Sequence, residues 1–245
     1  MCGRFTLSAP VLKVREHFGL EELADFPPRY NIAPTQPILI VMEDEHVTGG
    51  PRRGRLARWG LIPAWAKDPA DIPLLFNARA ETAGERNAFR AALRYRRCLV
   101  PATGFYEWQK QGGKARSQPH FLRPRDGSLI AFAGLMETFL APDGSEIDTA
   151  TILTTQASAD LRPIHERMPV VVPQMAFDFW LNCRDNEPAD VTRLMGAAPE
   201  GLFEAIPVGE AVNSVANMGP TVQDRITPPD DGGSDAPGGQ ASLPF

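Results

Sequence analysis

Short strand-like segments follow one another through most of this 245-residue chain, and few helical patterns lie between them. Turn signals separate several of these segments, as at Gln111-Gly112-Gly113-Lys114 and at Arg125-Asp126-Gly127. Strands that lack regular helical crossovers favour an antiparallel sheet that closes or folds onto itself. We therefore expect an α+β fold with a mainly antiparallel, closed or barrel-like β core and peripheral helices. The predicted strands span residues 2–7, 37–42, 56–60, 98–101, 105–110, 120–123, 129–137, 149–155 and 168–172.

Helical periodicity is clearest near the start of the chain, where Val11, Val14 and Phe18 share one face. Ser8 is the predicted N-cap of this helix, and Gly19 is predicted to end it. We place this helix and the others at the margin of the sheet. The other predicted helices span residues 85–94, 174–181 and 189–195.

The stretch from residue 221 to residue 245 is rich in Pro, Gly and Asp and has almost no aliphatic periodicity. Such a composition predicts a flexible acidic tail. The tail contains four aspartates and one arginine, so it carries three of the five net negative charges of the chain. The folded domain is therefore predicted to span residues 1–220 and to be close to neutral.

Arginines are concentrated in two short segments of this nearly neutral domain. Two interpretations are open: a local basic patch for an anionic partner, or separate solvated arginines, which we expect for most of them. The two groups are Arg52, Arg53, Arg55 and Arg58, and Arg90, Arg94, Arg96 and Arg97.

The sequence gives no sign of a membrane, a disulfide or a metal. No basic region followed by an apolar core opens the chain, and no apolar run approaches the ~18 residues of a membrane span. We therefore expect a cytoplasmic protein. The three cysteines include no C-x-x-C pair, and Cys98 and Cys183 lie in apolar surroundings typical of buried free thiols. Neither a disulfide nor a zinc site is expected.

Cys2 follows the initiator methionine directly, so removal of Met1 would leave it with a free α-amine beside its thiol. An α-amine has a reference pKa of about 7.7–8.0 and a thiol one of about 8.5, so we expect both groups to be partly nucleophilic near neutral pH. Such a 1,2-aminothiol can attack an amide carbonyl. It can also condense with an aldehyde to a thiazolidine. The plainer interpretation is that Cys2 is simply a small residue after Met1.

Several segments place a polar residue among apolar or aromatic neighbours. Asn77 and Arg79 face the same side of an extended segment, and Glu107 stands inside an aromatic strand where desolvation raises a carboxyl pKa. His165 comes just before a strand, and residues 58–65 form a loop with two tryptophans. Taken singly, each has an ordinary structural explanation: a solvated Glu, a hydrogen-bonded His or a core Trp.

Taken together and in this order, the motifs are much more specific. The motifs are MCGRF at 1–5, YNIAP at 30–34, WGLIP at 59–63, NARAET at 77–82, RCLVP at 97–101 with GFYEW at 104–108, and IHERMP at 164–169. With these motifs in this order, the chain resembles the SOS response-associated peptidase (SRAP) family, the abasic-site processing proteins of bacteria and eukaryotes, over residues 2 to about 218.

The resemblance implies an SRAP-like fold and a protein that links Cys2 to the ring-opened aldehyde of an abasic site in a thiazolidine. Asn77 is similar to the family residue that holds the terminal amine or the reacting sugar. Glu107 corresponds to the family acid/base, and His165 to the histidine that manages protons in formation and reversal of the link. Autoprocessing ahead of Cys2, implied by the word peptidase, and lyase-type strand cleavage are possible side activities.

The resemblance also implies a partner: single-stranded DNA that contains abasic sites, including junctions with duplex. It implies a monomer that works near the replication fork of a bacterium, with no cofactor, metal or membrane. Ala66 stands where some family members have a second tryptophan, which weakens the expected base stacking. The implied phosphate ligands are Arg4, Arg79 and Arg167, and the implied lining of the DNA channel is Asn31, Pro34, Trp65 and Thr154.

Two other classes stay open at the level of the residues. N-terminal-nucleophile glutamine amidotransferases also begin Met-Cys-Gly, but they continue with an apolar residue and a second glycine, whereas this chain continues with Arg4 and Phe5. A non-covalent single-strand binding module would explain the arginines and tryptophans but would leave Cys2, Glu107 and His165 without a role. Glutaminase activity, trapping of aldehyde DNA and simple binding distinguish the three classes.

Overall fold

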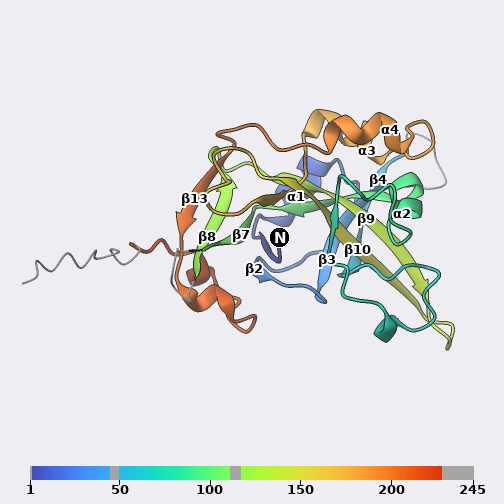
Figure 1. Ribbon diagram of the computed structural model, residues 1–245, viewed down its shortest axis with the longest axis horizontal. Coiled ribbons are helices and arrows are strands. Elements are labelled where there is room, and N and C mark those ends of the chain that lie inside the picture. The colour runs from blue at the N-terminus through green and yellow to red at the C-terminus, as the bar shows by residue number, and fades with distance from the viewer. Residues whose placement is uncertain (1, 45–49, 111–116, 228–245) are drawn as a thin grey trace, which may run out of the picture.

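Two β-sheets carry the fold of the computed structural model, which describes residues 2–44, 50–110 and 117–227 (Figure 1). The first sheet has five strands in the order β13-β8-β7-β1-β2, and every neighbouring pair is antiparallel. The short β1 therefore lies between β7 and β2, inside the sheet. Its strands are β1 (Arg4–Leu7), β2 (Arg29–Ile32), β7 (Gly104–Lys110), β8 (Ser117–Pro124) and β13 (Phe203–Pro207).

The second sheet has eight strands and closes into a barrel. β10 pairs with β4 and with β9, and β3 and β6 join β4 to β9, so these five strands form a continuous ring. β5 adds to β10 in parallel, and β11 and β12 pair with β10 and β9. The strands are β3 (Pro37–Glu43), β4 (Arg52–Trp59), β5 (Asn77–Arg79), β6 (Arg97–Ala102), β9 (Ile130–Leu140), β10 (Glu146–Gln156), β11 (Arg167–Pro169) and β12 (Val171–Val172).

The helices are short and lie outside the barrel, as Figure 1 shows for α2, α3 and α4. This arrangement confirms the predicted α+β class with a mainly antiparallel, closed β core. The α-helices are α1 (Val11–Phe18), α2 (Arg90–Tyr95), α3 (Phe177–Leu181) and α4 (Pro188–Val191). The 3-10 helices are η1 (Pro69–Asp71), η2 (Gln174–Ala176), η3 (Thr192–Leu194), η4 (Glu210–Asn213) and η5 (Pro220–Gln223).

The predicted start of α1 is wrong, whereas its predicted end is right. Pro10 is the N-cap and no side chain caps the helix, while Ser8 hydrogen-bonds Thr103, the residue between β6 and β7, instead. Gly19 takes the left-handed conformation, with φ of 64°, and its amide closes the last turn, as a C-terminal glycine typically does. The helix predicted from residue 85 begins only at Arg90, and the other two predicted helices are each part 3-10 helix.

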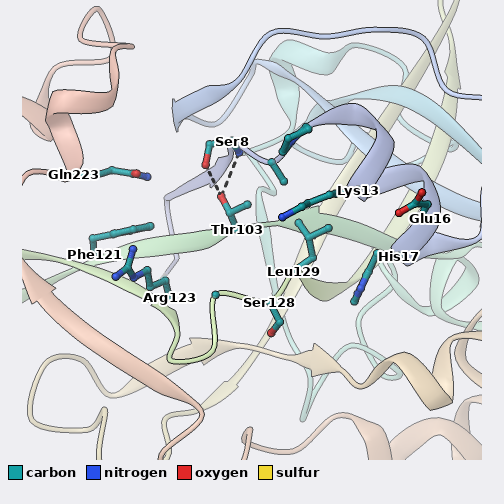
Figure 2. Close-up of a pocket in the computed structure, with 13 residues that line it drawn as sticks. Ser8, Lys13, Glu16, His17, Thr103, Phe121, Arg123, Ser128, Leu129 and Gln223 are labelled. Carbon is teal, nitrogen blue, oxygen red and sulfur yellow. Dashed lines mark hydrogen bonds between the residues drawn. The ribbon is translucent and has the colours of Figure 1, made fainter.

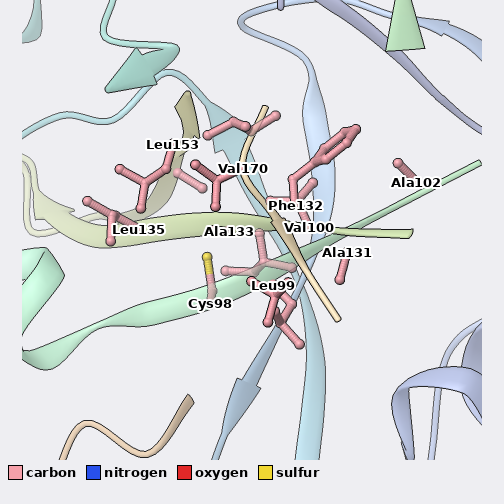
Figure 3. Close-up of a cluster of buried hydrophobic side chains, with 14 of the residues drawn as sticks. Cys98, Leu99, Val100, Ala102, Ala131, Phe132, Ala133, Leu135, Leu153 and Val170 are labelled. Atoms are coloured by element: carbon pink, nitrogen blue, oxygen red, sulfur yellow. The ribbon is translucent and has the colours of Figure 1, made fainter. Parts of the chain in front are cut away.

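Both faces of the barrel wall are apolar and buried along β6 and β9, where Leu99 pairs with Ala133 and Val100 with Phe132 (Figure 3). Gly134 allows this close approach, because a Cβ there would lie 2.7 Å from Sγ of Cys98. The core is therefore closely packed at the β6–β9 pair, where even one added methyl group would clash.

The folded domain extends beyond the predicted boundary at residue 221. Val222 in η5 is buried in a small apolar cluster with Tyr106 and Phe121, and the amide of Ile226 donates to the Pro207 carbonyl at 2.9 Å. Residues 221–227 are thus held against the first sheet by the burial of Val222 and by the main-chain hydrogen bond of Ile226. The rest of the predicted tail, from residue 228, and the predicted turn at 111–114 lie outside the described residues.

Within the described ranges, no helix is both long and apolar enough to span a bilayer. The same part of the chain holds no group of three or more His, Cys, Asp or Glu side chains placed to bind a metal ion.

Candidate active site

Cys2 lies two residues ahead of β1 and its side chain is fully buried. Its thiol lies 3.7 Å from the Arg4 carbonyl. Its own carbonyl accepts a hydrogen bond of 2.8 Å from Nδ2 of Asn77, which stands at the start of β5 in the second sheet. The first reactive candidate is therefore fixed at the contact between the two sheets.

Glu107 comes from β7, the antiparallel neighbour of β1, and is 2% exposed. Side chains alternate along this strand: Phe105 joins the main core and Tyr106 joins the smaller cluster, so Glu107 lies on the Phe105 face. Burial raises the pKa of Glu107 from 4.5 to about 7. A substantial fraction of this carboxyl therefore keeps its proton at neutral pH, as the aromatic surroundings predicted.

His165 approaches Glu107 from the loop before β11, with Nε2 at 3.9 Å from Oε2 of Glu107. Its Nδ1 lies 3.0 Å from both the amide nitrogen and the carbonyl oxygen of Arg167. The amide donates to Nδ1 of the neutral ring, which places the ring proton on Nε2 toward Glu107, and the carbonyl can accept from Nδ1 once the ring is protonated. Burial lowers the pKa of His165 from 6.5, so the ring is mostly neutral at pH 7.

The thiol of Cys2 is protonated in this structure's environment and is therefore a weak nucleophile. Burial, and after it the charge of Glu107, raise the pKa of the Cys2 thiol well above its ordinary value. The expectation that the thiol is partly ionised near neutral pH is therefore wrong, since the site is too poorly solvated for a second negative charge. The thiol can react only after a neighbouring group has taken its proton.

Arg4 and Asn31, predicted to contact DNA, bind other parts of the protein. The Arg4 guanidinium donates to Oδ1 of Asn31 at 2.8 Å and to the carbonyls of Val212 and Asn213 at 2.6 and 3.0 Å. Asn31 is 3% exposed, and its Nδ2 donates to the carbonyls of Val212, Ser214 and Asn217. In this structure the two side chains hold the segment around η4 against β1 and β2.

Arg167 and Thr154 lie together near His165. Thr154 is fully buried, and its carbonyl accepts from Nη2 of Arg167 at 2.6 Å. Glu81 completes the group, with its two carboxylate oxygens 2.8 and 2.9 Å from Nη1 and Nη2 of Arg167. Glu81 was not singled out from the sequence, although it shares the NARAET motif with Asn77 and Arg79.

Arg79, Trp65 and Pro34 are the predicted DNA contacts that solvent reaches. Trp65 is 55% exposed, Arg79 is exposed and Pro34 is half-buried. The Arg79 side chain makes no hydrogen bond or ion pair to another residue in the described ranges, although its charge helps to lower the pKa of Glu81. These side chains are free to meet a ligand.

The two sequence clusters of arginines do not form a basic patch. Five of the eight pair with carboxylates: Arg52, Arg53, Arg55, Arg94 and Arg96 contact Asp178, Asp44, Asp148, Glu187 and Glu137. Arg97 is buried and donates to main-chain carbonyls. These arginines therefore serve mainly as internal ties.

A cavity of about 640 Å³ opens beside α1, between Ser8, Lys13, Thr103 and Arg123 (Figure 2). None of the predicted site residues lines it. The candidate reactive residues Cys2, Glu107 and His165 thus lie outside this cavity, at the contact of the two sheets.

Fold and site together define a protein with a closed β-barrel, a second antiparallel sheet and a buried cysteine at residue 2 beside a buried acid. Residues 1–215 match the SOS response associated peptidase (SRAP) family, and the chain belongs to this family of abasic site processing proteins. It is 38% identical over 223 residues to "Abasic site processing protein YoqW" of Bacillus subtilis (strain 168), a match that covers 90% of this chain and 97% of the relative.

More distant relatives agree with this assignment. "Abasic site processing protein YedK" of Escherichia coli (strain K12) is 32% identical, over 89% of this chain and 97% of the relative. A solved structure from Bacteroides thetaiotaomicron superposes with a TM-score of 0.81 at 24% identity, over 92% of this chain and 100% of that chain. The last match supports the fold alone.

Proposed function

We propose that this protein binds single-stranded DNA at an abasic site and joins Cys2 covalently to the lesion. Removal of Met1 leaves Cys2 with an α-amine beside its thiol. The ring-opened abasic sugar offers an aldehyde, which a 1,2-aminothiol converts into a thiazolidine. The link shields the lesion from strand cleavage and from copying.

The proposed reaction forms two bonds. The α-amine attacks the aldehyde carbon, and loss of one water leaves an imine. The thiol then adds across the C=N bond, so that sulfur bonds to carbon and nitrogen gains a proton. One water is released overall, and no oxidant or reductant is required.

Glu107 acts in this scheme first as an acid and then as a base. With a pKa of about 7 it is partly protonated at neutral pH and can donate to the ring oxygen as the sugar opens. The carboxylate left behind accepts the proton that the buried Cys2 thiol retains. One buried carboxyl thus serves both proton transfers.

Asn77 and His165 support the reacting groups. The Asn77 amide fixes the Cys2 carbonyl, and its buried Oδ1, which has no hydrogen-bond partner within the described ranges, can accept an N–H from the Cys2 amine. His165 Nε2 lies 3.9 Å from Glu107, so a small approach or one bridging water would let the two exchange protons as the link forms and reverses.

The observation that carries this proposal is the meeting of Asn77, Glu107 and His165 around residue 2. They come from β5, β7 and the loop before β11, which lie far apart in the sequence. A cysteine with only a packing role needs no buried acid beside it. The relatives named above are abasic site processing proteins, which supports the same chemistry.

The proposed ligand is single-stranded DNA, including its junctions with duplex. Arg79 offers an exposed charge for a phosphate, and Trp65 offers an exposed indole on which an unpaired base can stack. Intact duplex is expected to bind less tightly, because its bases already stack on one another. Competition between strands, junctions and duplex of equal length measures this preference.

Intact-mass spectrometry tests the covalent step. We expect the purified protein to lack Met1 and, after incubation with an oligonucleotide carrying one abasic site, to gain the mass of the strand less one water. Cys98→Ala is the matched control, since it removes another buried free thiol and should keep the adduct. Full activity with Met1 retained, or no gain in mass, would contradict the proposal.

Two side activities belong to the same proposal. The imine can direct strand cleavage of a lyase type before the ring closes, which borohydride trapping and gel analysis detect. Autoprocessing would remove any residues ahead of Cys2, and a variant extended before Cys2 tests it by mass.

A further inference from the structure

We propose that Glu81 occupies the phosphate position on Arg167 in the DNA-free protein, and that a DNA phosphate must displace it. This inference rests on the proposed function and on the expectation, from the family resemblance, that Arg167 is a phosphate ligand. It makes Glu81 a residue that sets DNA affinity without entering the covalent chemistry.

The geometry of the pair resembles that of a bound phosphate. Both oxygens of Glu81 lie within 2.9 Å of Nη1 and Nη2 of Arg167, so the carboxylate binds this two-nitrogen fork of the guanidinium in a bidentate manner. A phosphate presents two oxygens to a guanidinium in the same way. Both anions cannot fill the fork at once.

Glu81 is the partner that is easier to move. Its side chain is 44% exposed and belongs to the turn after β5, whereas that of Arg167 is 17% exposed and comes from β11. The guanidinium is also fixed by its bond of 2.6 Å to the Thr154 carbonyl. An arriving phosphate would therefore find Arg167 in place and need only turn Glu81 toward solvent.

The pair also lies beside the reactive group. The Arg167 amide is 3.0 Å from Nδ1 of His165, and the charge of Arg79 contributes to the lowered pKa of Glu81, after the hydrogen bond from Arg167. Glu81 thus holds its charge at neutral pH and competes with phosphate throughout the working range.

The test compares Glu81→Gln with Glu85→Gln by fluorescence anisotropy, using a single-stranded oligonucleotide without abasic sites. Glu85 is also exposed, carries the same charge and forms no ion pair or side-chain hydrogen bond within the described ranges. Because an exposed ion pair is weak, we expect Glu81→Gln to bind about two- to five-fold more tightly than wild type. Glu85→Gln should differ from wild type by less than this.

A double-mutant cycle shows whether the effect passes through Arg167. The gain from Glu81→Gln should vanish in an Arg167→Gln background, and it should shrink with Arg167→Lys, which cannot present the same fork. Thermal unfolding shows whether each variant is folded. If Arg167→Gln is not folded, the comparison with Arg167→Lys still tests the proposal.

Different failures have different meanings. Equal or weaker binding by Glu81→Gln relative to Glu85→Gln would overturn the role of Glu81. Wild-type affinity in Arg167→Gln would overturn the phosphate contact itself. The covalent proposal is judged separately by the mass of the adduct with abasic DNA, which neither binding result alters.

Discussion

The reactive corner around Cys2 and the arginines predicted to bind DNA are built in opposite ways. At the corner, burial keeps the Cys2 thiol protonated, Glu107 partly protonated and His165 mostly neutral at pH 7 before any ligand arrives. Among the arginines, Arg4 is tied to carbonyls and Arg167 to a carboxylate. Under the proposed function, this difference means that the chemistry is preorganised, whereas DNA binding through Arg4 or Arg167 has to compete with internal partners.

The largest expected effect is loss of the adduct on replacing Cys2. Cys2→Ala removes the thiol, so the stable link should disappear while most DNA affinity remains, because binding depends on arginines and stacking. Cys2→Ser keeps the amine and should give only a reversible imine, visible by intact mass after borohydride reduction. A stable adduct in Cys2→Ala would place the reaction on another residue.

The next effect is a slower reaction in Glu107→Gln. A positioned general acid contributes about 10²–10⁴-fold, so single-turnover cross-linking should slow by that range while DNA affinity changes little. The wild-type rate should fall above pH 7, because the protonated fraction of a group with a pKa of about 7 falls there. The rate of Glu107→Gln should not show this fall above pH 7. If the variant reacts at the wild-type rate at every pH, Glu107 is a purely structural residue.

The same carboxyl should lower stability in alkaline solution. Its pKa is raised from 4.5 to about 7 on folding, so its stabilising contribution is present below pH 4.5 and is lost as the pH rises through 7. This shift corresponds to about 3 kcal/mol of unfolding free energy. The unfolding free energy of Glu107→Gln, measured with urea, should therefore rise relative to that of wild type by about that amount as the pH increases from about 4 to about 8.

The motifs predicted which residues to examine but not what each one contacts. Asn77, Glu107 and His165 were selected from short motifs, and the structure brings Asn77 and Glu107 to Cys2 and His165 to Glu107. Arg4 binds carbonyls more than 200 positions away, and Arg167 binds Glu81 across 86 positions, distances over which local pattern carries no information. Long-range packing decided these partners.

The same reason explains which elements were predicted. β3, β7 and β9 have strongly apolar or aromatic sequences and were found, whereas β2 and β13 were missed. β13 reads Phe-Glu-Ala-Ile-Pro and is set by its pairing along β8 rather than by its own propensity. For the same reason, the sequence did not predict that the folded region continues past residue 221, because burial of Val222 depends on a cluster built by other strands.

A smaller effect is expected where a predicted DNA contact is an internal tie. Asn31→Ala removes three hydrogen bonds to the carbonyls of Val212, Ser214 and Asn217 from a buried site. The Val212 carbonyl keeps its bond from Arg4, and Ser214 and Asn217 are exposed, so each lost bond should cost only about 0.5–1.5 kcal/mol. Chemical unfolding measures this loss, and hydrogen exchange should increase around η4; unchanged stability with weaker DNA binding would instead make Asn31 a DNA contact.

The smallest effect belongs to Arg79, which of the three predicted phosphate ligands is the one without an internal partner in the described part of the chain. Arg79→Ala should leave unfolding unchanged, because the side chain is exposed and holds no other residue. Its loss should reduce the salt dependence of single-strand binding by about 0.7 in the slope of log K against log salt, the value for one phosphate contact. Arg4→Ala provides the comparison: it should lower stability through the lost bonds to Val212 and Asn213. If Arg79→Ala keeps the full slope while Arg4→Ala reduces it without loss of stability, Arg4 leaves its internal partners to bind DNA, and the contrast between corner and arginines no longer holds.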